Sequence, residues 1–346
     1  MKIIITTKCL ERGGSEVLLS QVIPNLISYG YQVEVVYFKL GLNDLAGEIA
    51  SYGAKVKYIG PLSFFSFFGT VFRYFSYVIK SNPRVIFEHS PIVSVLTRLL
   101  FFKKKIVYLE HSVLDNYNIF TRNLNKITYP LISHLICCSE QVHNSNGRKG
   151  IVLSNAVKLA EDNIVPELSY PGYKVIIAVA NLSVVKNHQM LIDAFGLMKY
   201  KDVKLVIVGQ ARDNYDNVIQ AINNSPKKED IILYGESHDV YPLLASSDIF
   251  CLTSRHEGLP ISLLEAMSMG VVPVCTSVGG ITSVVGCDEG FLVDDFDTSV
   301  FSNYLDMLCN DDVMRENMSH KAKKKVIREF NLNNYCESLH NIFKRC

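Results

Sequence analysis

Two glutamates eight residues apart, Glu257 and Glu265, lie in the segment SRHEGLPISLLEAMSMG, residues 254–270. Pro260 suits the first position of a helix, where its fixed φ is preorganised and its missing N–H is not needed. Gly270 suits the left-handed position just beyond a helix end. The spacing therefore predicts a loop that carries Glu257, followed by a helix that carries Glu265.

The start of this predicted helix can hold an anion. Its first backbone N–H groups have no partner within the helix, and the helix dipole favours negative charge there. Carboxylates accept hydrogen bonds from vicinal hydroxyls. A ligand with a diphosphate between two sugar rings fits both features, which describes a nucleotide sugar; two solvated glutamates beside an ordinary helix are the alternative. The donor-binding residues expected here are Gly258, Leu259, Pro260, Ile261 and Glu265.

A second candidate phosphate loop follows the first apolar run, in KCLERGGSEVLLSQ. Gly13 and Gly14 stand where a loop passes into a helix, with Ser15 as the expected N-cap and Glu16 in the first turn. Two glycines let the backbone approach a phosphate closely. An ordinary tight turn is the alternative interpretation.

Two predicted strands end in the same tripeptide, EHS, at residues 88–90 and 110–112. The repeat places His89 and His111 at the carboxyl edge of a parallel sheet, where ligands bind. A histidine in such a place can contact a ligand or simply satisfy a structural hydrogen bond. We favour the structural role for His89.

One lysine stands just before a predicted helix, in VANLSVVKNHQMLIDAF, residues 179–195. Asn187 is a candidate cap for that helix, so the Lys186 ammonium can reach an anion held at the helix start. The alternative is a solvated surface charge.

The complete 254–270 string resembles that of the retaining glycosyltransferases of glycosyltransferase family four, which have the two-domain GT-B fold. The resemblance extends to four further segments: GGSE at 13–16, EHS at 110–112, SNAV at 154–157 and VANLSVVKN at 179–187.

The resemblance implies roles for particular residues. Gly14 would lie closest to the donor diphosphate, and His111 would lie near the reacting sugar. An arginine and a lysine five residues apart neutralise the diphosphate in the family. Lys186 matches the lysine, whereas Asn181 occupies the position of the arginine and supplies a hydrogen-bond donor without charge.

The chain of 346 residues is too long for one typical core and fits two domains. Short β-branched runs alternate with helical patterns throughout, which predicts an α/β fold of two Rossmann-like, doubly wound parallel sheets that face a cleft. We expect an N-terminal acceptor-binding domain over 1–160, a C-terminal nucleotide-sugar-binding domain over 161–328 and a polar linker near 159–173. By resemblance, a terminal helix over 329–346 crosses back to the first domain.

The two halves carry opposite charge. Residues 1–160 hold 18 Lys and Arg against 9 Asp and Glu, whereas the remainder holds 17 against 25. A basic half indicates nucleic acid or an anionic membrane as a partner. Because the basic residues are interleaved with long apolar runs and no nucleic-acid module is recognisable, we expect the membrane surface and no nucleic acid.

The strongest apolar run, residues 62–79, contains Arg73, which argues against a membrane-spanning helix. Its phenylalanines instead follow the spacing of one helix face. Either that face packs in the core or it lies at a membrane interface, next to the cationic LLFFKKK segment. The membrane-facing residues expected are Phe65, Phe68, Phe72, Phe75, Lys103, Lys104 and Lys105.

Nine cysteines without a CxxC pattern indicate neither a disulfide framework nor a zinc site, and Met1 runs directly into KIIIT without a signal peptide. We therefore expect a cytoplasmic protein, peripheral on the inner face of the cell membrane.

The sequence predicts a retaining glycosyltransferase that uses a nucleotide sugar, expected to be a UDP-sugar, as co-substrate and needs no cofactor or metal. The resemblance implies a lipid-linked saccharide as acceptor in bacterial surface polysaccharide synthesis. The expected catalytic residues are His111, Glu257 and Lys186. The alternatives are an epimerase or phosphorylase of the same fold, a glycosidase, or a noncatalytic nucleotide-sugar binder.

Overall fold

The computed structural model describes residues 1–41, 44–160 and 163–346, which form two compact units. Unit 1 consists of Met1–Ala156 and Leu332–Cys346, and unit 2 consists of Val157–Asn331. The division thus falls just before the boundary expected at residue 160. The segment expected as the linker lies within unit 2, and its residues 161–162 lie outside the described part of the chain.

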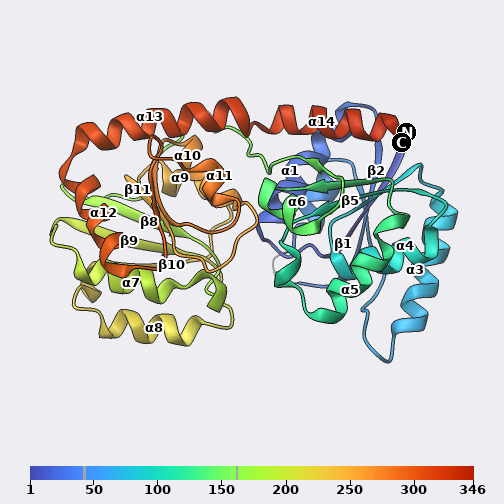
Figure 1. The fold of residues 1–346 in the computed structure, drawn as a ribbon, viewed down its shortest axis with the longest axis horizontal. Helices are drawn as coiled ribbons and strands as arrows, with labels where there is room; N and C mark the ends of the chain where they lie inside the picture. Colours follow the sequence, from blue (N-terminus) through green and yellow to red (C-terminus); the bar gives the residue numbers. More distant parts are fainter. Residues whose placement is uncertain (42–43, 161–162) are drawn as a thin grey trace. The chain divides into compact units, whose positions relative to one another are not determined.

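Unit 1 is built on a seven-stranded sheet in the order β3-β2-β1-β4-β5-β6-β7, with all neighbours parallel (Figure 1). Its central strands are buried on both faces, which is why they read as continuous apolar runs instead of alternating ones. The strands are β1 (Lys2–Cys9), β2 (Gln32–Lys39), β3 (Lys55–Tyr58), β4 (Val85–Glu88), β5 (Lys105–Glu110), β6 (His134–Cys137) and β7 (Ile151–Val152).

Helices cover both faces of this sheet. Ile86 packs into a core with Tyr74 and Phe101, whereas the neighbouring Phe87 points to the opposite face and contacts Phe343. The helices are α1 (Gly14–Ser28), α2 (Ala46–Ser51), α3 (Phe67–Ser81), α4 (Pro91–Phe101), α5 (Ile119–Thr128), α6 (Glu140–Asn146) and α14 (Leu332–Arg345), with short 3-10 turns η1 (Leu114–Asn116) and η2 (Tyr129–Leu131).

Unit 2 contains a six-stranded parallel sheet in the order β10-β9-β8-β11-β12-β13. Each β-branched run expected as a strand in this half forms one. The strands are β8 (Lys174–Val179), β9 (Val203–Val208), β10 (Ile231–Gly235), β11 (Ile249–Leu252), β12 (Val272–Thr276) and β13 (Phe291–Val293).

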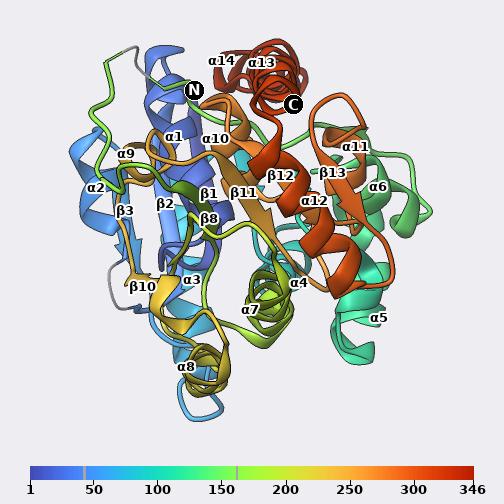
Figure 2. The ribbon, with the colours of Figure 1, turned by 90° about the vertical axis from the view of Figure 1, so that its left-hand side faces the viewer.

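Successive side chains of β8 enter two different cores. Ile176 packs with residues of α7, α8 and α12, whereas Ile177 packs with residues of α10 and α13 on the other face (Figure 2). The helices are α7 (His188–Leu197), α8 (Tyr215–Asn224), α9 (Tyr241–Leu244), α10 (Ile261–Ser268), α11 (Ile281–Val284), α12 (Thr298–Asn310) and α13 (Asp312–Glu329), with 3-10 turns η3 (Val184–Lys186) and η4 (Lys228–Asp230).

Both strand orders are doubly wound, which confirms the predicted fold class. In unit 1 the strand order reverses between β1 and β4, and in unit 2 it reverses between β8 and β11. Loops that leave neighbouring strands in opposite directions at such a point open a crevice at the carboxyl edge of the sheet, where ligands bind in folds of this kind. The loops after β1, β4, β8 and β11 are therefore the first places to look for a site.

One glycine in unit 2 fits only because it lacks a side chain. A Cβ at Gly209, just after β9, would lie 2.0 Å from the carbonyl oxygen of Ala180. We predict that Gly209→Ala lowers the free energy of unfolding by about 1–3 kcal/mol, because backbone must shift to admit the methyl group. Chemical denaturation measures the change. The control is Gly47→Ala in α2, where a Cβ meets open space; equal stability of the two variants would contradict the prediction.

Candidate active site

In unit 2, the loops after β8 and β11 carry opposite charges that meet. Lys186 ends η3 after β8, and Glu257 follows β11. Lys186 Nζ lies 2.5 Å from Glu257 Oε1, and the two side chains are 25% and 9% exposed. The sequence analysis proposed Lys186 and Glu257 as site residues from two separate motifs. The structure adds that they form a partly buried ion pair at the point where the strand order reverses.

The structure places both motif glutamates as predicted. Glu257 lies in a loop, Glu265 lies inside α10, and Gly270 has a φ of +80° just beyond the helix end. The prediction for Pro260 was wrong by one position: with ψ of 128° it is the extended N-cap, and the helix begins at Ile261. Within the described chain no side chain caps α10, so its first-turn N–H groups can bind an anion.

The expected donor-binding segment can face a ligand mainly through its backbone. The side chains of Leu259 and Ile261 are buried, and the carbonyl of Gly258 accepts a hydrogen bond from the Gly280 N–H at 2.6 Å. Glu265 is also largely buried, and Tyr241 lies near it. Burial, with a smaller contribution from the Glu265 charge, raises the pKa of the Tyr241 phenol.

Sequence reasoning missed Gly279. It has a φ of +58°, and a Cβ there would lie 2.0 Å from the carbonyl oxygen of Glu257. The backbones of Gly279 and Glu257 therefore lie so close together that no side chain fits at position 279. The paired glycines directly after β12 are the sequence signal that could have identified it.

Two asparagines of the β8 loop have side chains that contact neighbouring loops. Asn181, which replaces the expected arginine, accepts a hydrogen bond from the Gln210 N–H at 3.3 Å through Oδ1. Asn187 stands at the N-cap position of α7 with a φ of 51°, but its side chain does not cap the helix, contrary to prediction. Instead its Oδ1 accepts from Arg255 Nη2 at 3.3 Å.

His188, which sequence reasoning did not consider, follows Lys186 by two positions in the chain. It is 2% exposed and lies next to the backbone of Ala180. Burial, assisted by the charge of Lys186, lowers its pKa to about 4. The imidazole is therefore neutral at pH 7 and adds no charge beside Lys186.

In unit 1, the loop after β1 passes into α1 at the predicted glycines. Gly13 is the N-cap and Gly14 is the first helical residue. The prediction that Ser15 caps the helix was wrong, because it lies inside the first turn and donates to Glu16 Oε2 at 2.8 Å. Glu16 folds back toward Gly13, and burial raises the pKa of its carboxyl.

The two histidines of the EHS tripeptides meet at the carboxyl edge of the unit 1 sheet. His89 Nδ1 lies 3.4 Å from His111 Nε2. Burial lowers both pKa values, that of His111 to about 4, and the proximity of His111 lowers the pKa of His89 further. Both rings are therefore neutral at pH 7, able to exchange hydrogen bonds with hydroxyl groups but carrying no charge.

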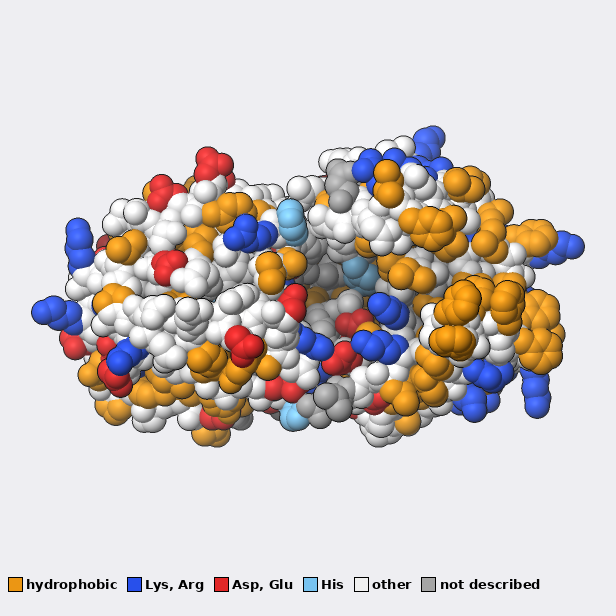
Figure 3. Space-filling model, turned by 90° about the horizontal axis from the view of Figure 1, so that it is seen from below, with side chains coloured by type: hydrophobic (Ala, Val, Ile, Leu, Met, Phe, Trp, Pro, Cys, Tyr) orange, Lys and Arg blue, Asp and Glu red, His pale blue; other side chains and the backbone are white. Residues whose placement is uncertain are grey.

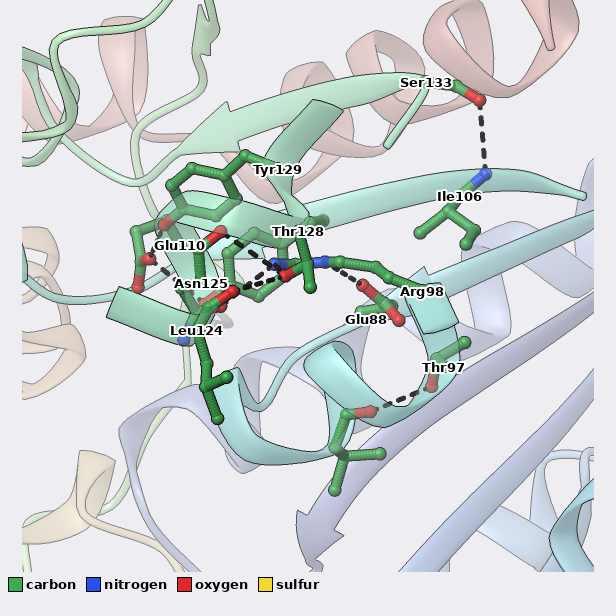
Figure 4. Close-up of polar contacts among 12 residues, drawn as sticks. Glu88, Thr97, Arg98, Ile106, Glu110, Leu124, Asn125, Thr128, Tyr129 and Ser133 are labelled. Atoms are coloured by element: carbon green, nitrogen blue, oxygen red, sulfur yellow. Dashed lines mark hydrogen bonds and ion pairs between the residues drawn. The ribbon is translucent and has the colours of Figure 1, made fainter. Parts of the chain in front are cut away.

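A buried polar network includes Glu88 and Glu110, the residues that precede the two histidines (Figure 4). The fully buried Arg98 of α4 pairs with Glu88 at 3.4 Å and donates to Asn125 Oδ1 at 3.0 Å. Glu110 accepts a hydrogen bond from Tyr129 at 2.9 Å. Glu88 and Glu110 immediately precede the two histidines, so the network fixes the strand ends from which the histidines project.

The phenylalanine face of α3 and the preceding loop is exposed, which excludes the core interpretation. Phe65, Phe68, Phe72 and Phe75 are 97%, 84%, 71% and 41% exposed. Figure 3 shows apolar side chains with Lys and Arg beside them on the surface of unit 1. On α5, Ile119, Phe120 and Ile127 add exposed apolar side chains that sequence reasoning missed.

The three lysines expected beside that face differ in their exposure and in their contacts. Lys103 is exposed and lies 5.9 Å from the ring of Phe102. Lys104 donates to Asn82 Oδ1 at 2.6 Å, and Lys105 begins β5 near His134. Lys103 and Lys105 are thus both exposed and able to meet an anionic surface, whereas Lys104 is half-buried. Among the described helices, none combines the length and apolar character needed to cross a bilayer.

Comparison with known proteins finds a family model that is similar to the second half of the chain. Residues 160–325 match the family of glycosyl transferases group 1. The chain is also 31% identical over 159 residues to N-acetyl-alpha-D-glucosaminyl L-malate synthase of Bacillus anthracis. It is 33% identical over 156 residues to N-acetylgalactosamine-N,N'-diacetylbacillosaminyl-diphospho-undecaprenol 4-alpha-N-acetylgalactosaminyltransferase of Campylobacter jejuni. These matches cover 45% and 44% of this chain, and the chain spans 42% of each relative.

Solved structures show the same fold over the whole chain. The Anabaena protein HepE in complex with UDP and glucose superposes with a TM-score of 0.89 at 17% identity, covering 100% of both chains. A glycosyltransferase from Rickettsia africae gives 0.83 at 19% identity, covering 99% of this chain and 98% of its own. The chain therefore has the GT-B fold.

The ion pair generates a prediction for UDP binding. Lys186→Met should weaken UDP binding by about tenfold or more, because it removes a charge-assisted contact and leaves Glu257 facing the diphosphate. Glu257→Gln should leave UDP affinity unchanged or increase it, because the ammonium is released. Calorimetry at fixed ionic strength measures both.

Glu289→Gln is the matched control, because Glu289 pairs with Lys325 at 3.5 Å in the same unit. It should not change UDP affinity. Equal weakening by Lys186→Met and Glu257→Gln would show that the pair does not act on a diphosphate as described.

Proposed function

We propose that the protein is a retaining glycosyltransferase that moves a sugar from a UDP-sugar to a lipid-linked saccharide in bacterial polysaccharide synthesis. The match of residues 160–325 to glycosyl transferases group 1 and the likeness to UDP-bound HepE support this proposal. The observation that carries it is the Lys186–Glu257 pair beside the uncapped start of α10.

The difficulty of the reaction is charge separation. As the bond between sugar and diphosphate breaks, negative charge grows on the leaving phosphate and the sugar becomes oxocarbenium-like. In the proposed mechanism, Lys186 and the first-turn amides of α10 meet the phosphate charge. We propose that these groups suffice without a divalent cation.

The two motif glutamates take different parts in the proposed mechanism. Glu265, inside α10, accepts hydrogen bonds from the ribose diol. Glu257 orients hydroxyls of the donor sugar and places negative potential near the anomeric carbon. When the diphosphate draws Lys186 away, the Glu257 carboxylate loses its partner and becomes free to accept from those hydroxyls.

We assign His111 to contact with a hydroxyl of the reacting sugar. Its neutral ring suits that role, because a neutral imidazole offers one donor and one acceptor. His89, 3.4 Å away, holds the tautomer and orientation of His111. In the retaining route the acceptor attacks from the face that the diphosphate leaves, and a phosphate oxygen takes its proton.

The lipid-linked acceptor requires access to a membrane, and the exposed apolar face of unit 1 suits this. Names of relatives support such an acceptor, since the Campylobacter protein acts on a diphospho-undecaprenol substrate. We propose that the α3 face, with Lys103 and the apolar residues of α5, rests on the anionic inner surface of the cell membrane.

A noncatalytic nucleotide-sugar binder is the second candidate, favoured by Asn181, which leaves one expected positive charge out of the site. Labelled UDP-sugars incubated with bacterial membranes separate the possibilities. We predict label in the lipid fraction, and a loss of about 100-fold in Glu257→Gln. Interconverted nucleotide sugar would indicate an epimerase, a sugar phosphate formed with inorganic phosphate would indicate a phosphorylase, and binding without turnover would indicate the binder.

The membrane proposal makes its own prediction. Replacing Phe68, Phe72 and Phe75 together with Ser should reduce binding to vesicles of anionic phospholipid at least about tenfold, because each exposed ring contributes apolar area to the bilayer. Vesicle co-sedimentation measures this loss, and an unchanged melting temperature confirms that the variant is folded.

A triple serine variant of Val165, Val313 and Ile327 provides the control, since these are exposed apolar residues of unit 2. It should bind vesicles like the parent protein. If both triple variants bind equally, the α3 face does not contact the membrane.

A further inference from the structure

The backbone next to Lys186 is held by the loop after β11 through contacts separate from the ion pair. Thr253 Oγ1 donates to the carbonyl oxygens of Lys186 at 3.2 Å and Asn187 at 3.0 Å. The Arg255 N–H donates to the carbonyl oxygen of Val185 at 2.8 Å. The Arg255 guanidinium also donates a hydrogen bond to the Asn187 side-chain oxygen.

Thr253 is the buried centre of these contacts. It is 2% exposed and directly follows β11, which pairs with β8 in the sheet. Its single hydroxyl proton lies between the carbonyl oxygens of two consecutive residues, so one side chain holds the two peptide units that flank Asn187. No sequence motif identified Thr253, because its partners lie 66 and 67 residues away.

The backbone that Thr253 holds has an unfavourable conformation at Asn187. Asn187 has a φ of 51°, in the left-handed region that side chains with a Cβ rarely adopt. Such a conformation persists where its surroundings impose it. The contacts from Thr253 and Arg255 hold Asn187 from the loop after β11, and local backbone hydrogen bonds to Val184 and from Met190 add to them.

We propose that Thr253 is a positioning residue that keeps Lys186 at the anion site when a diphosphate binds. This inference rests on the proposed function of the site. In the structure the ammonium is fixed by Glu257; a diphosphate that draws it away leaves a long flexible side chain anchored only at its backbone. The Thr253 hydroxyl supplies that anchor and reduces the conformational freedom lost on binding.

The test compares Thr253→Val, which keeps the shape and removes the hydroxyl, with Thr253→Ser, which keeps the hydroxyl. Thr253→Val should weaken UDP binding about fivefold, whereas Thr253→Ser should stay within about twofold of the parent protein. Calorimetry gives the affinities, and thermal melting confirms folding.

A double-mutant cycle separates positioning from general stability. If Thr253 acts through Lys186, Thr253→Val should change UDP affinity little in the Lys186→Met background. The same fivefold loss in both backgrounds, or no loss in either, would overturn the inference. If Lys186→Met itself leaves UDP binding intact, the proposed function of the site fails instead.

If Thr253→Val does not fold, two variants of Asn187 test the same proposal. Asn187→Ala should weaken UDP binding because it disfavours the left-handed conformation and removes the bond to Arg255, whereas Asn187→Gly should restore most of the affinity. Equal affinity of the alanine and glycine variants would contradict a role for the imposed backbone conformation.

Discussion

The candidate site depends on one electrostatic contact, the ion pair between Lys186 and Glu257. The two residues are 71 positions apart, and they meet because β8 and β11 are neighbours in the sheet although other strands separate them in the chain. Their loops leave the sheet where its order reverses, which is where a doubly wound fold opens a crevice. Thr253, Arg255 and Gly279 all serve to hold these loops in place.

One further positive charge lies close to this pair, the Arg255 guanidinium, whose Nη2 donates to Asn187 Oδ1 at 3.3 Å. The neighbouring His188 is neutral at pH 7, because burial lowers its pKa to about 4. The expected arginine is Asn181, whose carbonyl oxygen contacts a backbone N–H. In the proposed function, the groups that meet a diphosphate are Lys186 and the first-turn amides of α10, and Arg255 is a further cation beside them.

Much of this arrangement could be predicted from local sequence. β-branched runs predicted the strands, and the positions of Pro260 and Gly270 placed Glu257 in a loop and Glu265 in a helix because helix ends have strong local preferences. The predicted cap Ser15 was wrong because glycine is also acceptable at an N-cap, and the hydroxyl bonds to Glu16 instead.

The features of the site that the sequence did not predict depend on contacts between residues distant in the chain. The approach of Gly279 to Glu257, the contact between the two histidines and the contacts of Thr253 all follow from strand order. The phenylalanine spacing in α3 predicted an apolar face without deciding what covers it, and only the packing of Tyr74 and Val78 shows which face enters the core.

A crystal structure with UDP bound tests the central claim most directly. The account predicts the diphosphate within hydrogen-bonding distance, about 3 Å, of Lys186 Nζ and of the first-turn amides of α10, with the ammonium drawn from Glu257 toward a phosphate oxygen. UDP bound elsewhere, with the Lys186–Glu257 pair unchanged, would contradict it.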